Sequence, residues 1–317
     1  MTNFDFKVSV IIPLFNAEKY IKDAVESALS LTEVGEIIIV DDGSKDNSYE
    51  IAINLSNIYS SVKVYSHFGN KNLGPAATRN FGIKNASCMY ISFLDADDIY
   101  QKNRFICSKE IFLTQPLTEV VYACSHTIFL NEEGKKKYYN YEESHIYTLF
   151  KKVETKDLFK TLLFYGYGRI HTSAITIKVS ALNKTGLFNE NLLWGEDTEF
   201  WLRLAYETNM VPGELESPVS LRRIHDNNLV HQVDKAKFYE NEIYHSLFDW
   251  ASKNNLNFEI KNNIYNAHRL FTDSENSNQI VGFIKFCNRH LYIIFDIFFY
   301  KKIFLIVQNF LNIERRF

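Results

Sequence analysis

The segment DADD at residues 95–98 has the residue types and spacing best suited to chemistry. It directly follows the apolar run 90–94, which has the composition of a buried strand. Three carboxylates within four residues repel one another unless a cation or hydrogen-bond donors compensate their charge. Carboxylate oxygens suit Mg²⁺ or Mn²⁺, and such an ion neutralises the charge that develops on a departing diphosphate. The segment predicts a metal site, with a solvated acidic turn as the alternative.

Two further segments add polar groups that suit a nucleotide. DDGS at 41–44 follows the apolar run 36–40, and its glycine permits a tight turn. This group predicts recognition of a base or ribose, and the alternative is a turn that caps a helix. NLGPAATRN at 72–80 opens a helix and places Arg79 on its second turn, where a guanidinium can pair with aspartates or phosphate. An exposed helix arginine is the alternative.

The later segment WGED at 194–197 leads into an amphipathic helix. A carboxylate there, Asp197, is placed to act as a general base, an effect worth about 10²–10⁴-fold. Capping of the helix N-terminus by Asp197 is the alternative. His225 follows another strand-like run, and neutral imidazole is a frequent metal ligand. It takes part only if the fold brings it to Asp97, and otherwise it is a structural histidine.

The elements that position these residues follow from two alternating periodicities in the first hundred residues. Strands are expected at 8–14, 36–40, 62–66 and 89–94, and helices at 17–31, from about 46 and from about 74. Continuous apolar strands in this order predict an α/β fold with a mostly parallel sheet and helices on both faces. Ligands bind outside the carboxyl ends of such strands. The polar groups at 13–16, 41–44 and 95–98 are therefore expected at one edge.

The second half of the chain has a weaker pattern. Strands are expected at 120–130, 172–178 and 217–224, and a helix at 198–207. We assign one domain to residues 1–232, with two halves at 1–115 and 116–232. A helical region follows at 233–317. Its basic, aromatic-rich end predicts peripheral contact with a membrane surface, or packing on the domain or on another subunit of a homo-oligomer.

Composition narrows the class of protein. The 317 residues are 46% hydrophobic and 23% charged, which indicates a globular chain. A net charge of −3 from 35 basic and 38 acidic residues gives no field that favours nucleic acid. The four cysteines form no CxxC pair, and no signal-peptide pattern opens the chain, so we expect a cytoplasmic location. The sequence has no P-loop, complete dinucleotide fingerprint, GxSxG elbow or HExxH helix, which disfavours those classes.

Together these segments resemble the family 2 glycosyltransferases of the GT-A fold, an inverting group that makes bacterial polysaccharides and glycolipids. The resemblance runs from about residue 8 to residue 231. The matching segments are VIIPLFN at 10–16, VDDGS at 40–44, NLG at 72–74, ATRN at 77–80, LDADD at 94–98, GED at 195–197 and RIH at 223–225. Their joint order and spacing are far more specific than any one segment. Thr78 departs from the family's more usual alanine, and the tail beyond Val233 has no family pattern.

The resemblance implies that residues 1–115 form the nucleotide-sugar-binding half of the catalytic domain and residues 116–232 its acceptor half. It also implies a role for each matching residue. On the donor side it implies a nucleobase pocket, usually for uridine, lined by Pro13, Phe15 and Asp42, with Asn16 and Asn72 as further donor-binding residues. It implies that Arg79 braces the metal-site aspartates, and that Mn²⁺ or Mg²⁺ binds Asp97, Asp95 and His225. Asp95 would alternatively contact ribose. It implies that Asp197 takes the acceptor proton, with Trp194, Glu196 and Arg223 on the acceptor side or supporting the site.

The expected activity is transfer of a sugar from a UDP-sugar to a hydroxyl of a saccharide or glycolipid acceptor. The resemblance places it in the biosynthesis of a bacterial surface polysaccharide, such as capsule, O-antigen or lipooligosaccharide. Two other functions stay open. A sugar nucleotidyltransferase is disfavoured because no basic, glycine-rich loop follows the first strand. A non-catalytic protein that binds a sugar nucleotide is disfavoured because the set of carboxylates is complete.

Overall fold

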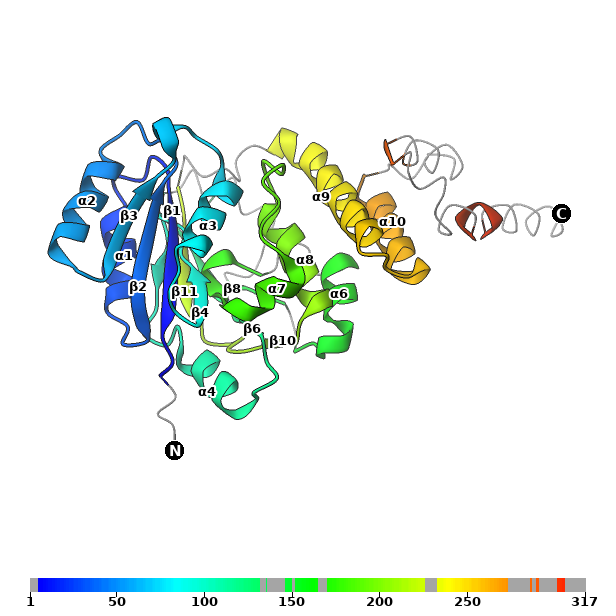
Figure 1. Cartoon of the computed structure of the whole chain (residues 1–317), viewed down its shortest axis with the longest axis horizontal. Coiled ribbons are helices and arrows are strands. Elements are labelled where there is room, and N and C mark those ends of the chain that lie inside the picture. The colour runs from blue at the N-terminus through cyan, green and yellow to red at the C-terminus, as the bar shows by residue number, and fades with distance from the viewer. Residues whose placement is uncertain are drawn as a thin grey trace. The chain divides into compact units, whose positions relative to one another are not determined.

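The computed structural model describes residues 5–131, 135, 146–149, 152–164, 170–225, 233–272, 286, 289–290 and 301–305. The chain divides into two compact units, residues 1–232 and residues 233–317 (Figure 1). The predicted site residues all belong to the first unit.

The first unit is built on a seven-stranded sheet in the order β10-β6-β9-β4-β1-β2-β3. Its strands are β1 (Val8–Leu14), β2 (Val34–Asp41), β3 (Val62–Ser66), β4 (Tyr90–Phe93), β6 (Val120–Tyr122), β9 (Ile175–Lys178) and β10 (Met210–Pro212). The four strands β3, β2, β1 and β4 run parallel to one another, whereas β9 is antiparallel to both its neighbours, β4 and β6. The predicted α/β fold with a mostly parallel central sheet is confirmed.

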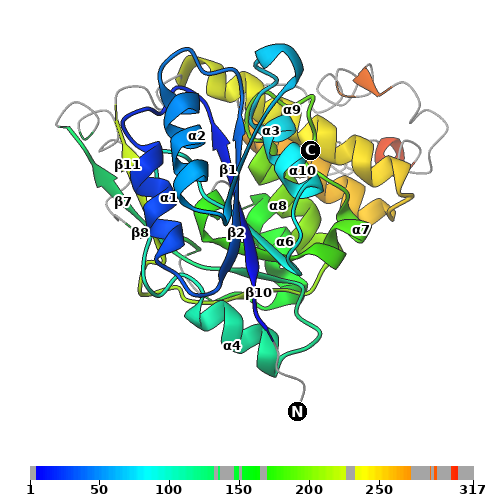
Figure 2. The ribbon, with the colours of Figure 1, turned by 60° about the vertical axis from the view of Figure 1, so that its left-hand side comes forward.

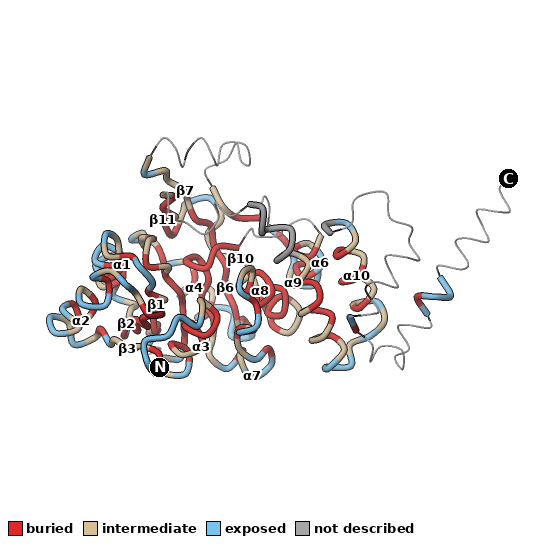
Figure 3. Tube along the Cα trace, turned by 90° about the horizontal axis from the view of Figure 1, so that it is seen from above, coloured by how far each residue is buried: buried red, intermediate tan, exposed pale blue. Residues whose placement is uncertain are grey.

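Helices cover both faces of this sheet, which explains why its strands are apolar on both sides. Figure 2 shows α1 (Ile21–Leu29) and α2 (Ser48–Ile58) on one face, and α3 (Pro75–Lys84), α6 (Thr155–Phe164) and α8 (Glu196–Glu207) on the other. In Figure 3, β1 and α8 are coloured mostly as buried. Helix α3 approaches β1 closely at Gly82, where an added Cβ would lie 2.4 Å from Cγ2 of Ile11.

A second, four-stranded sheet has the order β5-β11-β7-β8. Its strands are β5 (Ile99–Tyr100), β7 (Ser125–Phe129), β8 (Ile146–Tyr147) and β11 (Ser220–Ile224). The single strand expected at 120–130 is therefore wrong, because the chain leaves the main sheet at Ala123 and Cys124 and β7 pairs in the second sheet. Other helical elements that the structure describes in this unit include η1 (Phe68–Asn70), α4 (Ile106–Thr114), η2 (Thr172–Ala174), η3 (Val179–Ala181) and α7 (Leu182–Thr185).

The second unit contains the long helices α9 (Val233–Lys253) and α10 (Phe258–Thr272), which pack on each other. Both helices carry buried side chains, among them Tyr244, Phe248, Ile264 and Tyr265. Within the described residues, no helix is both long enough and apolar enough to cross a membrane. Most of the basic tail expected to contact a membrane or a subunit lies outside the described residues.

Candidate active site

The carboxyl ends of the parallel strands bring the predicted polar groups to one edge of the main sheet. Asp41 ends β2 in register with Leu14 at the end of β1, and β4 lies beside β1 and ends two residues before Asp95. The amino end of β9 meets the same edge, because β9 is antiparallel to β4. Residues just before β9, which include His171 and Thr172, therefore face the aspartates that follow β4.

Arg79 joins two acidic residues, Asp95 and Glu196, that are 101 residues apart in the sequence. Its side chain is buried, with one terminal nitrogen 2.9 Å from Oδ1 of Asp95 and the other 2.6 Å from Oε1 of Glu196. Burial alone would raise the pKa of Asp95, but the charge of Arg79, its hydrogen bond and the other basic groups nearby together outweigh burial and lower it. Arg79 is thus no exposed helix arginine, and it connects the strand-end aspartates to the start of α8.

The two acidic residues at the start of α8 have different environments. Glu196 is buried against Arg79, and burial together with the charge of Asp197 raises its pKa to about 7. Asp197 is partly exposed, and its Oδ2 accepts a hydrogen bond from the Thr172 hydroxyl at 3.4 Å. The helix cap is Gly195, in a left-handed conformation with φ 73°, so Asp197 is not the residue at the N-cap. Asp197 is the accessible carboxylate of the pair.

The fold brings His225 to Asp97, as a role in metal binding requires. Nε2 of His225 lies 3.1 Å from Oδ2 of Asp97, and Tyr20 stacks on the histidine ring. Arg223 is a neighbouring support, since its Nε donates to the Asp97 carbonyl and its backbone N–H donates to Asp98 Oδ1 at 3.1 Å. A carboxylate and an imidazole at an accessible strand end suit a divalent ion that takes its other ligands from phosphate and water.

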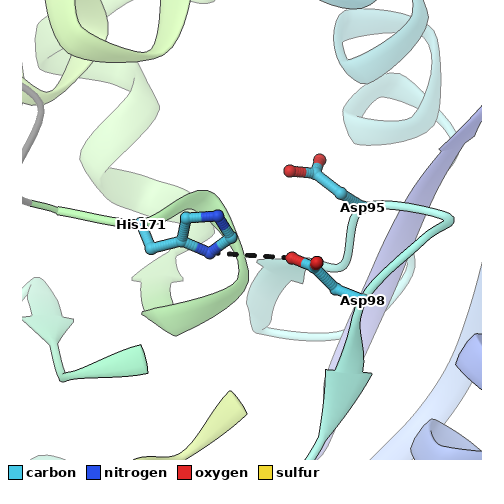
Figure 4. Close-up of side chains that lie close together, drawn as sticks. All are labelled: Asp95, Asp98 and His171. Carbon is cyan, nitrogen blue, oxygen red and sulfur yellow. Dashed lines mark ion pairs between the residues drawn. The ribbon is translucent and has the colours of Figure 1, made fainter. Parts of the chain in front are cut away.

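A second group that could hold a cation lies deeper. Asp95, Asp98 and His171 each place one ligand atom within 4.8 Å of the others (Figure 4). Asp98 is only 2% exposed, and its oxygens accept from the Ser173 hydroxyl and the Arg223 amide. Burial, with the charges of Asp97 and Asp95, raises the pKa of Asp98 well above its ordinary value. The buried, already bonded Asp98 fits a metal less well than the Asp97 and His225 pair.

On the side where the nucleobase is expected, Asp42 already forms hydrogen bonds to the protein backbone. Asp42 is buried, and its two oxygens accept from the amides of Leu73 at 2.6 Å and Gly74 at 3.0 Å. It therefore holds the loop that precedes α3. Phe15 is 48% exposed, and Asn16 accepts from the Lys45 amide at 2.7 Å. The remaining predicted residues of the site, Pro13, Asn72 and Trp194, are each at least partly accessible at their loops.

A family model described as glycosyl transferase family 2 matches residues 9–173, just over half of the chain. The chain belongs to glycosyl transferase family 2. The family predicted from the motifs is confirmed, and at this level so is the prediction of a glycosyltransferase.

Relatives of this family 2 chain extend the match. An uncharacterized glycosyltransferase of Rickettsia felis is 35% identical over 223 residues, which cover 69% of this chain and 33% of the relative. The minor teichoic acid biosynthesis protein GgaA of Bacillus subtilis is 28% identical over 203 residues, which cover 62% of this chain and 42% of that protein. The chain thus spans about a third to under half of the length of these two relatives.

A solved structure supports the fold. The crystal structure of S. aureus TarS 1–349 in complex with UDP-GlcNAc matches with a TM-score of 0.64 and 18% identity, over 84% of this chain and 73% of that one. The GT-A fold expected for a family 2 chain is confirmed.

The motifs missed three residues that the structure places at this edge. His171 lies beside Asp98, with Tyr147 packed edge-on against its ring. The Thr172 hydroxyl donates to Asp197, and the Ser173 hydroxyl donates to Asp98. Only the reversed direction of β9 brings residues 171–173 here, and a strand's direction has no local signature in its sequence. The sequence signal that could have identified these residues is the polar segment His-Thr-Ser directly before an apolar strand.

Proposed function

We propose that this chain transfers a sugar from a UDP-sugar to a hydroxyl of a saccharide or glycolipid acceptor, with inversion at the anomeric carbon. The observation that supports this most is the double contact of Arg79, which places a donor-side carboxylate, Asp95, in one site with Glu196 and the adjacent Asp197. Sugar transfer needs the donor-binding residues and the residue that takes the acceptor proton in the same site. The similarity to TarS, crystallised with UDP-GlcNAc, supports a nucleotide-sugar donor.

On the donor side, we assign the nucleoside to the loops after β1 and β2. Pro13, Phe15 and Asn16 would line the base, while Asp42 would shape the pocket through the backbone of Leu73 and Gly74. Asn72, next to that backbone, is an exposed polar group for the same side. Asp95 would contact ribose or diphosphate, and Arg79 would keep it in place.

We assign the divalent cation to Asp97 and His225. When bound there, Mn²⁺ or Mg²⁺ would neutralise negative charge on the departing diphosphate. The protein's own part is to hold the two ligands together, through the 3.1 Å contact between them and the Arg223 bond to the Asp97 carbonyl. Asp95 is a weaker candidate ligand, because one of its oxygens already pairs with Arg79.

Asp197 would act as the base. Its carboxylate would take the proton of the acceptor hydroxyl as that oxygen forms a bond to the anomeric carbon. The bond from that carbon to the diphosphate oxygen breaks, and its electron pair leaves with UDP. Thr172 and the Thr198 amide would hold the carboxylate in position. Trp194, just before α8, would lie on the acceptor side.

We propose that the product belongs to a bacterial surface polysaccharide, a role supported by the likeness to a teichoic acid biosynthesis protein. The first test is a screen of nucleotide sugars by hydrolysis and thermal shift, with Mn²⁺, with Mg²⁺ and with a chelator. We expect at least one UDP-sugar to stabilise the chain and to be hydrolysed slowly in a metal-dependent way. Asp97→Asn is the matched variant, and should lose the metal dependence. Absence of binding and turnover with every nucleotide sugar would refute the proposed function.

A further inference from the structure

His171 is a nearly buried imidazole that none of the proposed roles uses. It immediately precedes η2 and is 9% exposed. Its ring lies between Tyr147, at 5.7 Å between ring centroids, and Asp98, whose Oδ2 lies 3.7 Å from Nδ1. The next residue, Thr172, donates its hydroxyl hydrogen bond to Asp197. His171 thus lies beside the strand-end aspartates, and the residue that follows it in the chain contacts the proposed base.

The hydrogen bonds of His171 fix where its proton lies. Nδ1 accepts a hydrogen bond from the Ser173 amide at 3.3 Å, whereas its separation from Asp98 is too long for one. A ring whose Nδ1 is an acceptor must have its hydrogen on Nε2 when it is neutral. Burial and the charges of Arg222 and Arg79 lower the pKa of His171 to about 3, so the ring stays neutral.

The Nε2–H group points towards the reactive side of the site. In Figure 4 the ring nitrogen opposite the dashed contact lies on the side of the ring that faces Asp95. Within the part of the chain that the structure describes, no residue accepts a hydrogen bond from it. An N–H group that faces the site and has no acceptor among the described residues can donate a hydrogen bond to an acceptor oxygen of a bound ligand.

The same tautomer argues against His171 as a metal ligand. A metal on Nε2 would displace the hydrogen to Nδ1, where it would face the Ser173 amide, a second donor. A metal on Nδ1 would have to replace the bond from that amide. A neutral acceptor such as a hydroxyl oxygen suits the Nε2–H group without either loss.

We propose that Nε2–H of His171 donates a hydrogen bond to a hydroxyl of the sugar being transferred, and so helps to select the donor. This inference rests on the proposed function. The donor sugar is favoured over the acceptor because the group faces Asp95, on the side where the diphosphate would bind, while Thr172 faces the base. A site built to bond one hydroxyl discriminates strongly against a sugar that lacks it.

Two substitutions of His171 distinguish the roles of its two ring nitrogens. In His171→Asn, the side-chain oxygen can replace Nδ1 as acceptor for the Ser173 amide, but no donor reaches the Nε2 position. In His171→Gln, the side-chain nitrogen reaches that position. With the UDP-sugar found in the screen and no acceptor, we expect kcat/KM for hydrolysis to fall about 10- to 100-fold in H171N and to stay within about 5-fold in H171Q. UDP affinity should stay within about 2-fold of wild type in both variants.

A series of deoxy analogues of that sugar identifies the hydroxyl. One analogue should be a poor substrate for the wild type and no poorer for H171N, because the contact is already missing. The inference alone is overturned if wild-type hydrolysis is normal and H171N matches it, if H171N alters only the acceptor KM, or if H171N worsens every analogue equally. A wild-type chain that binds no UDP-sugar would instead overturn the proposed function, and this inference with it.

Discussion

Replacing Arg79 with alanine tests whether one buried guanidinium holds the two halves of the site together. The side chain is 6% exposed and contacts Asp95 at 2.9 Å and Glu196 at 2.6 Å. The substitution leaves both carboxylates in their places without the charge that compensates them. Both the stability of the first unit and the binding of a donor should therefore suffer.

The size of the effect follows from burial. Removing one partner of a buried ion pair costs about 3–5 kcal/mol, chiefly because the remaining charge is left unpaired. For a unit of this size that corresponds to a fall in Tm of about 6–20 °C, at about 2–4 °C per kcal/mol. The loss should be smaller at pH 5 than at pH 8. Without Arg79 the pKa of both carboxyls rises, and protonation at the lower pH then removes the unpaired charges.

Urea unfolding of the full chain at pH 5 and pH 8 measures this difference, and thermal shift with UDP measures donor binding. The matched control is Arg203→Ala, two turns further along α8. Arg203 is also buried, pairs with Glu199 at 2.7 Å and donates to the carbonyls of Thr185 and Leu187. R203A should lose stability while its folded fraction still binds UDP.

A loss below about 1 kcal/mol for R79A, or an equal loss at both pH values, would mean that the two carboxylates do not depend on this charge. A second variant sharpens the test: R79A combined with Glu196→Gln removes one of the unpaired charges. The double variant should recover part of the stability lost in R79A at pH 8. If the losses in stability of the two single variants simply add up in the double variant, the contact between Arg79 and Glu196 does not contribute.

Three further changes test other parts of the structure. Asp197→Asn should reduce transfer about 10²–10⁴-fold while UDP-sugar affinity persists, and normal turnover would refute its role as base. Because the pKa of Glu196, about 7, exceeds its ordinary 4.5, wild-type stability should fall as pH rises between those values. Glu196→Gln should flatten that slope in urea unfolding. Gly82→Ala should destabilise by about 1–3 kcal/mol through the 2.4 Å approach to Ile11, and less in an Ile11→Ala background; equal losses would argue against this clash.

The part of the fold that sequence predicts best is the parallel half of the main sheet. The strands expected at 8–14 and 62–66 match β1 and β3. Strand β1 is covered on both faces and is almost entirely apolar, whereas β3 at the edge of the sheet alternates apolar and polar residues at Val62, Lys63 and Val64. The order of strands and helices then implies one ligand edge, and the carboxylates at 95–98 do lie there. Local sequence suffices where the neighbours of a strand are those of an ordinary βαβ unit.

The break at Ala123 and Cys124 shows where local sequence fails. Both residues are small, apolar and buried, so the run 120–130 has no turn signal. The change of sheet is instead fixed by distant partners: the Ala123 amide donates to Ala174, and the Cys124 amide donates to Glu214. The same kind of long-range pairing sets the direction of β9, and so places His171 in the site.

The pair Glu196 and Asp197 shows why spacing alone does not assign a base. Both are carboxylates at the start of the same helix, and only the resemblance to the family singles out Asp197 as the base. The structure separates them, because Gly195 turns the chain so that Glu196 is buried against Arg79 while Asp197 stays partly accessible beside Thr172. A buried carboxylate tied to an arginine cannot approach an acceptor without breaking that contact. The accessible Asp197 can, so the geometry supports our proposal that Glu196 holds the site and that Asp197 takes the acceptor proton.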